Sequence, residues 1–435
     1  MIFLGQASNY KFGRVLRHLF ARGKAQDSLR LRSRLAKVYQ VEQHDLDEPG
    51  DRVLLYHTGR SALAAAILAI APKGSRVIIP GLTCIAVVRA VRAAGCEPVF
   101  VDIDPETLQY DWQKLEQTLE ALRNNSKNAP SSSIDNNQKN CYNVNTIVAQ
   151  NTLGLPLDMQ KLEKLAQKYH LEIVEDLAHS AGRFYADGRK IGSVGAATAL
   201  SFGKGKAIDT ISGGALVLRS AKFTMPSPPR FAACRSARWR ERWYPALGAI
   251  IRAGYHVKLG KVFTAIFLKL GWIERSADAE LNLDTRLEHW QAKLAWRQLE
   301  QFPVNAKQQA KVFCAVSTSD QDQTSRITDK PKMQFPLREH YFVRQRNKLL
   351  AELEQKGYYL NEIWYDTPVS PSRYLKEADF PNQICPQTVA IAKTIINLPT
   401  WYPEEKLAPV RQLIQPYILD ASKIDELSHP HGDQS

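Results

Sequence analysis

The sequence predicts an α/β protein with a mostly parallel sheet flanked by helices, followed by a smaller C-terminal α+β domain. Between residues 51 and 218, short runs rich in Val, Ile and Leu alternate with helical segments, which is typical of a parallel sheet with crossover helices. From Lys332 onward the pattern changes to strand, helix, strand and a final helix. This change indicates a second, smaller unit.

The expected elements follow from local composition. The N-terminal arm carries leucines spaced among arginines, which favours a basic helix. The run VLLY at 53–56 leads into an alanine-rich helix that reaches residue 71. Later strands are expected in RVIIPG, EPVFVDID, TIVAQNT, LEIVED, 200–202, 214–218 and YYLNEIWY, and later helices in the segments that end at 94, 170, 299 and 357 and in the segment after 406.

Changes in composition divide the chain into four expected segments. Within the second of them, residues 124–145 are polar and of low complexity, which predicts a surface insertion without a packed core. A Pro-rich stretch, MPSPPR, lies near the start of the third. The four segments are a basic N-terminal arm (1–42), a large domain (43–222), a basic amphipathic insertion (223–280) and a small C-terminal domain (281–435).

The positive charge is concentrated in two segments. The chain has a net charge of +14, and residues 1–42 carry nine Lys and Arg against two acids. Residues 219–275 carry twelve Lys and Arg against two acids, so the rest of the chain is close to neutral. Such runs are usually solvated faces, or in the second case part of a dimer interface. Cations that alternate with Leu, Ile, Phe and Trp are also typical of a membrane-surface contact, and both interpretations stay open.

Composition also excludes several classes of protein. The six cysteines have neither paired nor metal-ligand spacing, which predicts reduced thiols and no metal site. The N-terminal apolar run is too short for a signal peptide, and no uncharged run approaches the ~20 residues that span a bilayer. No recognition helix or related motif accompanies the basic charge, so we expect no nucleic-acid partner. The chain is therefore expected to be cytoplasmic, either free or peripheral at the inner membrane face.

Three side chains near strand ends indicate the chemistry. Asp176 ends the run LEIVED, and Ser201 and Lys206 follow the next apolar run. Because parallel strands present ligand-binding groups at their carboxyl ends, we expect the three to lie together. This set suits pyridoxal phosphate: the lysine forms an imine with the aldehyde, the acid keeps the pyridine nitrogen protonated, and hydroxyl and amide groups bind the phosphate. Taken alone, Asp176 could equally cap a helix, and Lys206 could be solvated.

A fourth element is the turn Gly59-Arg60-Ser61 between a strand and a helix. Such a turn presents backbone N–H groups and a hydroxyl to a phosphate at the helix N-terminus. An ordinary Ser N-cap is the alternative. The Gly-Lys pairs at 203–206 do not form a P-loop, because neither lysine is followed by Ser or Thr.

Together these motifs resemble the DegT/DnrJ/EryC1/StrS family of PLP-dependent sugar aminotransferases, which have the fold type I of PLP-dependent transferases. The resemblance covers about 56–217 and about 284–414. It rests on the Gly-Arg-Ser-Ala-Leu turn at 59–63, PVFVDID at 98–104, Glu-Asp-Leu-Ala-His at 175–179, Ser-Phe-x-x-x-Lys at 201–206 and the tail at 385–405.

The resemblance implies roles for individual residues. Asp176 would bind the pyridine nitrogen, His179 would lie beside the ring, and Lys206 would be the Schiff-base lysine. Ser201 and the turn Gly59, Arg60 and Ser61 would bind the phosphate.

Two positions depart from the family pattern. Cys84 stands where the family often has an aromatic residue that stacks on the cofactor ring. Asp284 stands where an Asn reaches the phosphate of a partner subunit, although Asn282 lies nearby. The stretch between Gly214 and Arg286 is also longer than in most relatives.

The resemblance and the residues together give two hypotheses. The first is a homodimeric aminotransferase that moves an amino group, with glutamate as the expected donor, to a nucleotide-linked keto-sugar for cell-surface polysaccharide or glycoconjugate synthesis. In it the freed Lys206 amine acts as general base and then acid. The second is a catalytically impaired scaffold that binds a partner or a membrane, which Cys84 and Asp284 would favour.

Overall fold

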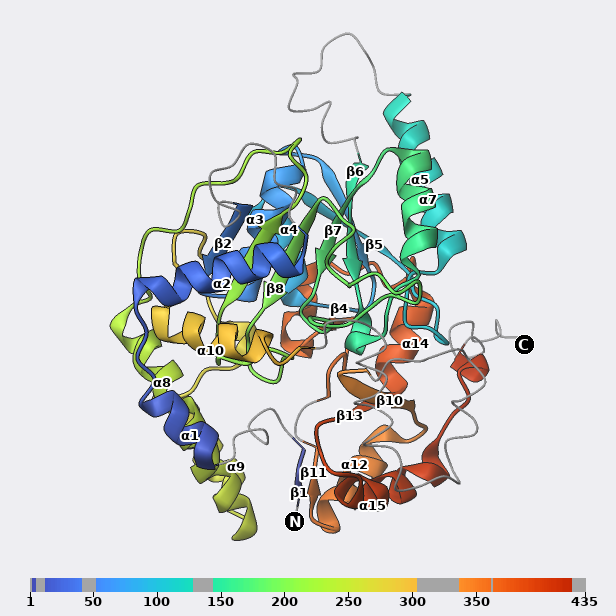
Figure 1. Cartoon of the computed structure of the whole chain (residues 1–435). Helices are drawn as coiled ribbons and strands as arrows, with labels where there is room; N and C mark the ends of the chain where they lie inside the picture. The colour runs from blue at the N-terminus through green and yellow to red at the C-terminus, as the bar shows by residue number, and fades with distance from the viewer. Residues whose placement is uncertain are drawn as a thin grey trace, which may run out of the picture.

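A seven-stranded sheet forms the centre of the molecule (Figure 1). The computed structural model describes residues 2–4, 12–40, 52–127, 144–302, 336–360 and 363–424. The strand order is β2-β9-β8-β7-β6-β3-β5, and β9 alone runs antiparallel to its neighbours. The strands are β2 (Val53–Tyr56), β3 (Arg76–Pro80), β5 (Glu97–Val101), β6 (Val144–Gln150), β7 (Glu172–Asp176), β8 (Ala197–Ser201) and β9 (Gly214–Leu218).

Helices cover both faces of this sheet, which confirms the predicted α/β class. Alternate residues of a strand are buried in two separate hydrophobic cores, because successive side chains of a strand point to opposite faces of the sheet. Val53 and Leu55 lie in one core, whereas Leu54 and Tyr56 lie in the other. The first core is closed by α2 (Ala25–Val38), α5 (Trp112–Lys127), α7 (Met159–Tyr169) and α10 (His289–Leu299), and the second by α3 (Gly59–Ile70) and α4 (Ile85–Ala93).

Two helices that the sequence assigns to other segments pack on the large sheet. Leu31 and Leu35 of α2, in the predicted N-terminal arm, are fully buried in the core of the large sheet. Ala292 and Ala295 of α10, in the predicted small domain, lie in the same core. The apolar stripe of each helix matches the exposed face of the sheet, and this match decides the packing more strongly than the charge of the flanking residues does.

The smaller unit is built on an antiparallel pair of strands. Strand β10 (Arg338–Phe342) pairs with β13 (Ile395–Pro399). Two short parallel pairs join it to distant segments: β1 (Ile2–Phe3) with β11 (Tyr358–Tyr359), and β4 (Thr83–Cys84) with β12 (Val369–Ser370). Its other elements are α12 (Arg346–Gln355), η6 (Ser372–Tyr374), α13 (Leu375–Ala378), α14 (Pro386–Thr394), α15 (Glu404–Ile414) and η7 (Gln415–Tyr417).

The amphipathic insertion forms a helical hairpin. Helices α8 (Arg235–His256) and α9 (Gly260–Lys269) project beside α1 (Phe12–Leu19), at the lower left of Figure 1. Two short turns, η3 (Thr152–Gly154) and η4 (Ser276–Asp278), complete the elements. Within the ranges described, no helix combines the length and hydrophobicity needed to cross a membrane.

Two predicted segments differ from the structure or fall partly outside it. Of the polar stretch predicted at 124–145, helix α5 includes residues up to Lys127 and β6 begins at Val144, while the residues between them lie outside the described ranges. The strand predicted over YYLNEIWY is limited to Tyr358–Tyr359, and Trp364 and Tyr365 are buried beyond it.

Candidate active site

Two adjacent acids end β7, and their surroundings separate their roles. Glu175 is fully buried and accepts hydrogen bonds from the Tyr185 hydroxyl at 2.6 Å and from three backbone N–H groups of residues 192–195 at 2.5–2.7 Å. Within the described part of the chain, the Asp176 carboxylate accepts one, from the N–H of Ala178 at 2.9 Å. Glu175 therefore fixes a loop, whereas Asp176 keeps acceptor capacity for a ligand.

The Asp176 carboxylate is held in a nearly closed environment. Its exposed fraction is 8%. Burial raises its pKa above the ordinary carboxyl value, and the Ala178 hydrogen bond and the positive charge of Lys206 offset part of that rise. Lys206 is thus close enough to act on Asp176 electrostatically. A bound cation or N–H donor would stabilise the ionised carboxylate further.

His179 is a neutral imidazole packed on an aromatic ring. Its ring stacks on Trp364 with a centroid distance of 4.7 Å, and Nδ1 lies 3.2 Å from the N–H of Leu153 and 3.3 Å from the Tyr365 hydroxyl. Because an amide N–H can only donate, Nδ1 accepts and the proton resides on Nε2. Burial, followed by the charges of Lys206 and other nearby cations, lowers the pKa of His179 well below its usual range.

The structure distinguishes the two lysines that follow β8. Lys204 Nζ donates to the carbonyl of Glu274 at 2.6 Å and lies over the Tyr244 ring. Lys206 Nζ instead lies 4.3 Å from the ring centroid of Trp364, the ring on which His179 stacks. Lys206 is therefore the amine that shares a site with Asp176 and His179.

The predicted phosphate turn lies at the start of α3, beside the end of β8. Thr58 caps the helix by accepting from the N–H of Ser61 at 3.2 Å. A Cβ on Gly59 would lie 2.5 Å from the Ser201 side chain, and one on Gly214 would lie 2.6 Å from the Gly59 Cα. Glycines at both positions let the helix start approach Ser201. The first N–H groups of a helix have no intrahelical partners, so this cradle suits a phosphate.

The other two side chains of the turn make contacts within the protein. The Ser61 hydroxyl is fully buried, lies 2.9 Å from Thr58 Oγ1 and accepts from the N–H of Asn282 at 3.2 Å. The Arg60 guanidinium donates to the carbonyl of Ala277 at 3.0 Å and to two further carbonyls of residues 276–279. Ser61 and Arg60 therefore tie α3 to the 276–282 segment, and the backbone N–H groups of the turn remain the groups predicted to bind a phosphate.

Cys84 and Tyr365 line the same region. Cys84 ends β4 and is half-buried. Burial raises the pKa of Tyr365 far above its ordinary value, and electrostatic interactions with the nearby Cys84 and Asp176 add to that effect. Tyr365 thus lies near both residues while contacting His179. Trp364 and Tyr365, which both belong to the small unit, form an aromatic wall against His179.

Three residues of the site were missed from the sequence: Trp364, Tyr365 and Arg338. Arg338 is fully buried, donates to Asn397 Oδ1 at 2.7 Å, and its guanidinium lies 4.4 Å from the Trp364 ring. The available signal was the Trp-Tyr pair at the end of YYLNEIWY. We interpreted it as part of a strand, because aromatic residues are common in strands.

The donor set fits pyridoxal phosphate. Asp176 offers a carboxylate with acceptor capacity for a pyridinium N–H, and Lys206 offers a primary amine for an aldehyde. Ser201 and the start of α3 offer a hydroxyl and backbone amides for a phosphate. All of these groups lie at the carboxyl-terminal edge of the sheet.

A family comparison agrees with this geometry. The family model described as the DegT/DnrJ/EryC1/StrS aminotransferase family matches residues 52–415. The chain belongs to this family. Both the predicted family and its cofactor, pyridoxal phosphate, are thereby confirmed, while the roles of individual residues remain predictions.

Curated relatives of the family match part of the chain. A GDP-perosamine synthase of Escherichia coli O157:H7 is 30% identical over 211 residues, which are 48% of this chain and 50% of the relative. A GDP-perosamine synthase of Caulobacter vibrioides is 32% identical over 160 residues, 36% of this chain and 37% of the relative. The matches therefore span half or less of the length of these relatives.

Solved structures of family members share the fold over nearly the whole chain. A DegT/DnrJ/EryC1/StrS aminotransferase from Brucella abortus superimposes with a TM-score of 0.60 at 17% identity, covering 93% of both chains. The PLP form of a putative sugar aminotransferase from Streptococcus pneumoniae has a TM-score of 0.59 at 17% identity, covering 95% of this chain and 97% of that one. These similarities confirm the predicted fold class.

A largely buried ion pair joins the end of β2, just before the predicted phosphate turn, to the hairpin. His57 Nε2 lies 3.0 Å from Glu241 Oε1, and Glu241 also accepts from the Ser212 hydroxyl at 2.6 Å. Burial alone would lower the pKa of His57, but the hydrogen bond and charge of Glu241 outweigh burial and raise it. The pair therefore stabilises the fold fully below the unfolded His pKa of about 6.5, and this contribution is lost as pH rises through the folded value.

We expect Glu241→Gln to lower the melting temperature more at pH 5.5 than at pH 9. At the acidic pH it breaks the ion pair, at a cost of about 1–3 kcal/mol. Glu274→Gln is the matched control, because Glu274 pairs with Arg240 at 3.3 Å, and an arginine does not titrate in this range. An equal loss for Glu241→Gln at both pH values would contradict the assignment.

Proposed function

We propose that the protein is a PLP-dependent aminotransferase that acts on a nucleotide-linked keto-sugar. The observation that carries the proposal is the convergence of Lys206, Asp176 and His179 on one site within a fold of this family. Pyridoxal phosphate, when bound, supplies the electron sink that acidifies the Cα–H of an amino donor. The rest of the catalysis comes from the side chains described above.

Lys206 and Asp176 have complementary roles in this proposal. Lys206 Nζ removes the proton from the donor Cα as a general base, and the protonated amine later returns a proton as a general acid. The Asp176 carboxylate holds a proton on the pyridine nitrogen by accepting its N–H. Burial of Asp176 strengthens this interaction, because water does not compete for the carboxylate.

The charge of the site supports an acidic donor such as glutamate. The cations of Lys206 and Arg338 both lie against the Trp364 ring, at 4.3 and 4.4 Å from its centroid. Both also lower the pKa of His179, which reports a positive potential in the site. A dicarboxylate is attracted to such a potential more strongly than a neutral amino acid.

The sugar substrate is proposed from the relatives. The curated relatives include GDP-perosamine synthases and a dTDP-3-amino-3,6-dideoxy-α-D-galactopyranose transaminase of Aneurinibacillus thermoaerophilus. Their names support a nucleotide-linked keto-sugar as the acceptor, and cell-surface polysaccharide or glycoconjugate synthesis as the purpose. We also propose a cytoplasmic homodimer, which sedimentation velocity would test.

A catalytically impaired scaffold is the second candidate. Cys84 and Asp284 favour it, because they replace a stacking aromatic residue and a phosphate-binding amide. The Trp364–Tyr365 wall supplies aromatic surface in the site, and Tyr365 lies close enough to Cys84 to interact with it electrostatically. Asn282 has its backbone N–H on Ser61 of the phosphate turn. Both observations support the enzyme.

The absorbance spectrum of the purified protein with added pyridoxal phosphate tests the proposal. We expect glutamate to convert the visible band to that of the pyridoxamine form, and a nucleotide-linked 4-keto-sugar to restore it. Alanine, a donor without the second carboxylate, should act at least about tenfold more slowly. Equal rates with both donors would refute only the glutamate assignment. A protein that binds no chromophore would refute the enzyme and favour the scaffold.

A further inference from the structure

The α8–α9 hairpin exposes a continuous apolar surface, which we call the hairpin face. Trp239 and Trp243 have ring centroids 6.2 Å apart, and Trp239 and Trp272 have centroids 6.0 Å apart. These three rings therefore form one cluster between the start of α8 and the end of α9. The hairpin face consists of Trp239, Trp243, Ile250, Val257, Val262, Ile266, Leu270 and Trp272, each between 41% and 65% exposed.

The sequence of the hairpin separates this face from the side that packs on the protein. Trp239, Trp243, Ile250 and Val257 recur at helical spacing along α8 and its C-cap. Val262, Ile266 and Leu270 recur every fourth residue along α9 and its C-cap. A different set of apolar residues closes the core of the hairpin: Leu247, Ile251, Tyr255, Phe267 and Ile273. The exposed residues are therefore surplus to the packing of the hairpin itself.

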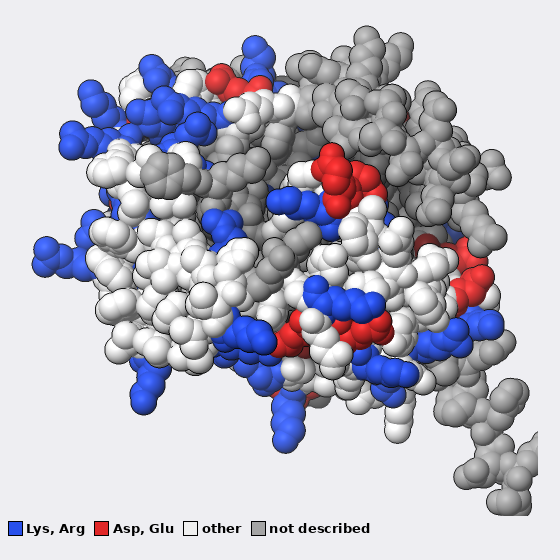
Figure 2. Space-filling model, turned by 90° about the horizontal axis from the view of Figure 1, so that it is seen from below, with Lys and Arg blue, Asp and Glu red and all other residues white. Residues whose placement is uncertain are grey.

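Exposed cations surround the hairpin face. Residues 231–275 contain nine Lys and Arg and two Glu. Glu241 is buried against His57, and Glu274 pairs with Arg240. In Figure 2 the left half of the molecule shows a broad uncharged surface with Lys and Arg at its margins. The exposed cations, none of which forms an ion pair among the described residues, are Arg235, Arg238, Lys258, Lys269 and Arg275.

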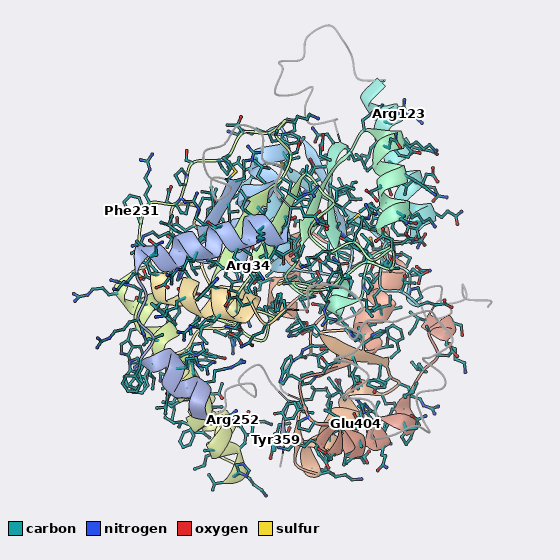
Figure 3. The ribbon with its side chains drawn as sticks, in the orientation of Figure 1. Arg34, Arg123, Phe231, Arg252, Tyr359 and Glu404 are labelled. Atoms are coloured by element: carbon teal, nitrogen blue, oxygen red, sulfur yellow. The ribbon has the colours of Figure 1, made fainter. Side chains whose placement is uncertain are left out.

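The hairpin is held rigidly by the rest of the chain. Glu241 pairs with His57 at the end of β2, and Arg242 donates to backbone carbonyls at the end of α1. At the other end, Tyr255 packs against Tyr359 with a centroid distance of 4.7 Å. Figure 3 shows Arg252 and Tyr359 near each other where the hairpin meets the small unit. The hairpin face is therefore presented by a fixed element.

We propose that the hairpin face docks on the surface of a bilayer containing anionic lipids. Trp, Ile and Leu side chains bury into the boundary between headgroups and acyl chains, and a surrounding set of Lys and Arg binds lipid phosphates. Each cation near such a surface strengthens the binding. This combination of exposed indole rings and cations without acidic partners is complementary to an anionic interface.

Charge also argues against a second copy of the chain as the occupant. A two-fold contact places the same patch on both subunits, so the cations of one hairpin would meet those of the other. Like charges placed opposite each other across an interface weaken association. An anionic lipid surface satisfies both the apolar residues and the cations, whereas a second hairpin face satisfies only the apolar residues.

Co-sedimentation with vesicles tests the proposal with the full chain. The probes are vesicles of phosphatidylcholine alone and vesicles with about one third phosphatidylglycerol. We expect binding to the anionic vesicles at 50 mM NaCl and at least about tenfold weaker binding at 500 mM, because the headgroup contacts are screened. Tryptophan fluorescence should shift to shorter wavelength on binding.

Two pairs of substitutions separate the hairpin face from the rest of the surface. Ile266→Ser with Lys269→Glu should weaken vesicle binding at least about tenfold without lowering the melting temperature, since both side chains are exposed. Ile384→Ser with Lys376→Glu makes the same chemical change on the exposed surface of the small unit. This control pair should bind vesicles like the wild type.

Several outcomes would overturn the proposal. They are absence of binding to anionic vesicles at low salt, an equal loss of binding in the control pair, and conversion of a dimer to a monomer by the hairpin pair. Salt-sensitive binding to duplex DNA that exceeds vesicle binding would also overturn it. Vesicle binding requires no pyridoxal phosphate, so its failure leaves the proposed aminotransferase activity untouched.

Discussion

Lys206→Ala is expected to abolish the visible absorbance of bound pyridoxal phosphate and to reduce the aminotransferase rate at least about 10⁴-fold. The substitution removes the amine that lies with Asp176 and His179 around the Trp364 ring. Under the proposed function, it removes the amine that links the protein to the cofactor aldehyde and the group that moves the proton. Absorbance titration with pyridoxal phosphate and a coupled glutamate assay measure the two effects.

Lys204→Ala is the matched control, because Lys204 lies two residues away but donates to the carbonyl of Glu274. We expect it to keep the visible band and most of the activity, and to lose about 1 kcal/mol of folding stability with that hydrogen bond. A Lys206→Ala variant that retained the visible band would refute the assignment. A Lys204→Ala variant that lost it would do the same.

Asp176→Asn is expected to lower the rate about 10²–10³-fold and to raise the melting temperature of the cofactor-free protein at neutral pH by about 1–2 °C. The amide cannot hold a proton on the pyridine nitrogen. The stability gain follows from the raised pKa of Asp176: ionisation of the buried carboxyl opposes folding. This penalty is absent below the unfolded pKa of about 3.9 and complete above the folded pKa.

At the neighbouring position, Glu175→Gln is expected to destabilise the fold, the opposite of the effect expected for Asp176→Asn. Glu175 accepts four hydrogen bonds in a fully buried site, and an amide NH₂ would face donors there. We expect a loss of about 2–4 kcal/mol of folding stability. Thermal melts at pH 7.5 and pH 4.5 distinguish the Asp176→Asn variant from the Glu175→Gln variant. If Asp176→Asn lowered the melting temperature at pH 7.5, the inference that ionised Asp176 destabilises the cofactor-free protein would be wrong.

Most of the fold was predictable, because the signals for it are local. The strands β3, β6 and β7 are short runs rich in β-branched residues and largely buried on both faces, and such runs are recognisable in the sequence. The packing of α2 and α10 was not predictable. Their apolar stripes indicate only that each helix packs against another part of the protein. Which part that is depends on how the whole sheet is assembled.

The polar residues of the site could be predicted from the sequence, whereas its aromatic residues could not. Asp176, Ser201 and Lys206 follow strands whose carboxyl ends must share an edge of the sheet. Trp364 and Tyr365 come from the small unit, more than 150 residues later in the sequence. No local pattern states that they pack on His179, because that contact depends on how two units dock.

The position of β2 has a consequence for the timing of cofactor binding. Its one partner in the sheet is β9, about 160 residues later in the chain, and the turn at Gly59 follows β2 directly. At roughly 5–20 residues per second, a ribosome takes on the order of ten to thirty seconds to make the intervening chain. A nascent protein therefore completes its phosphate cradle only after β9 has emerged, when about half of the chain has been made.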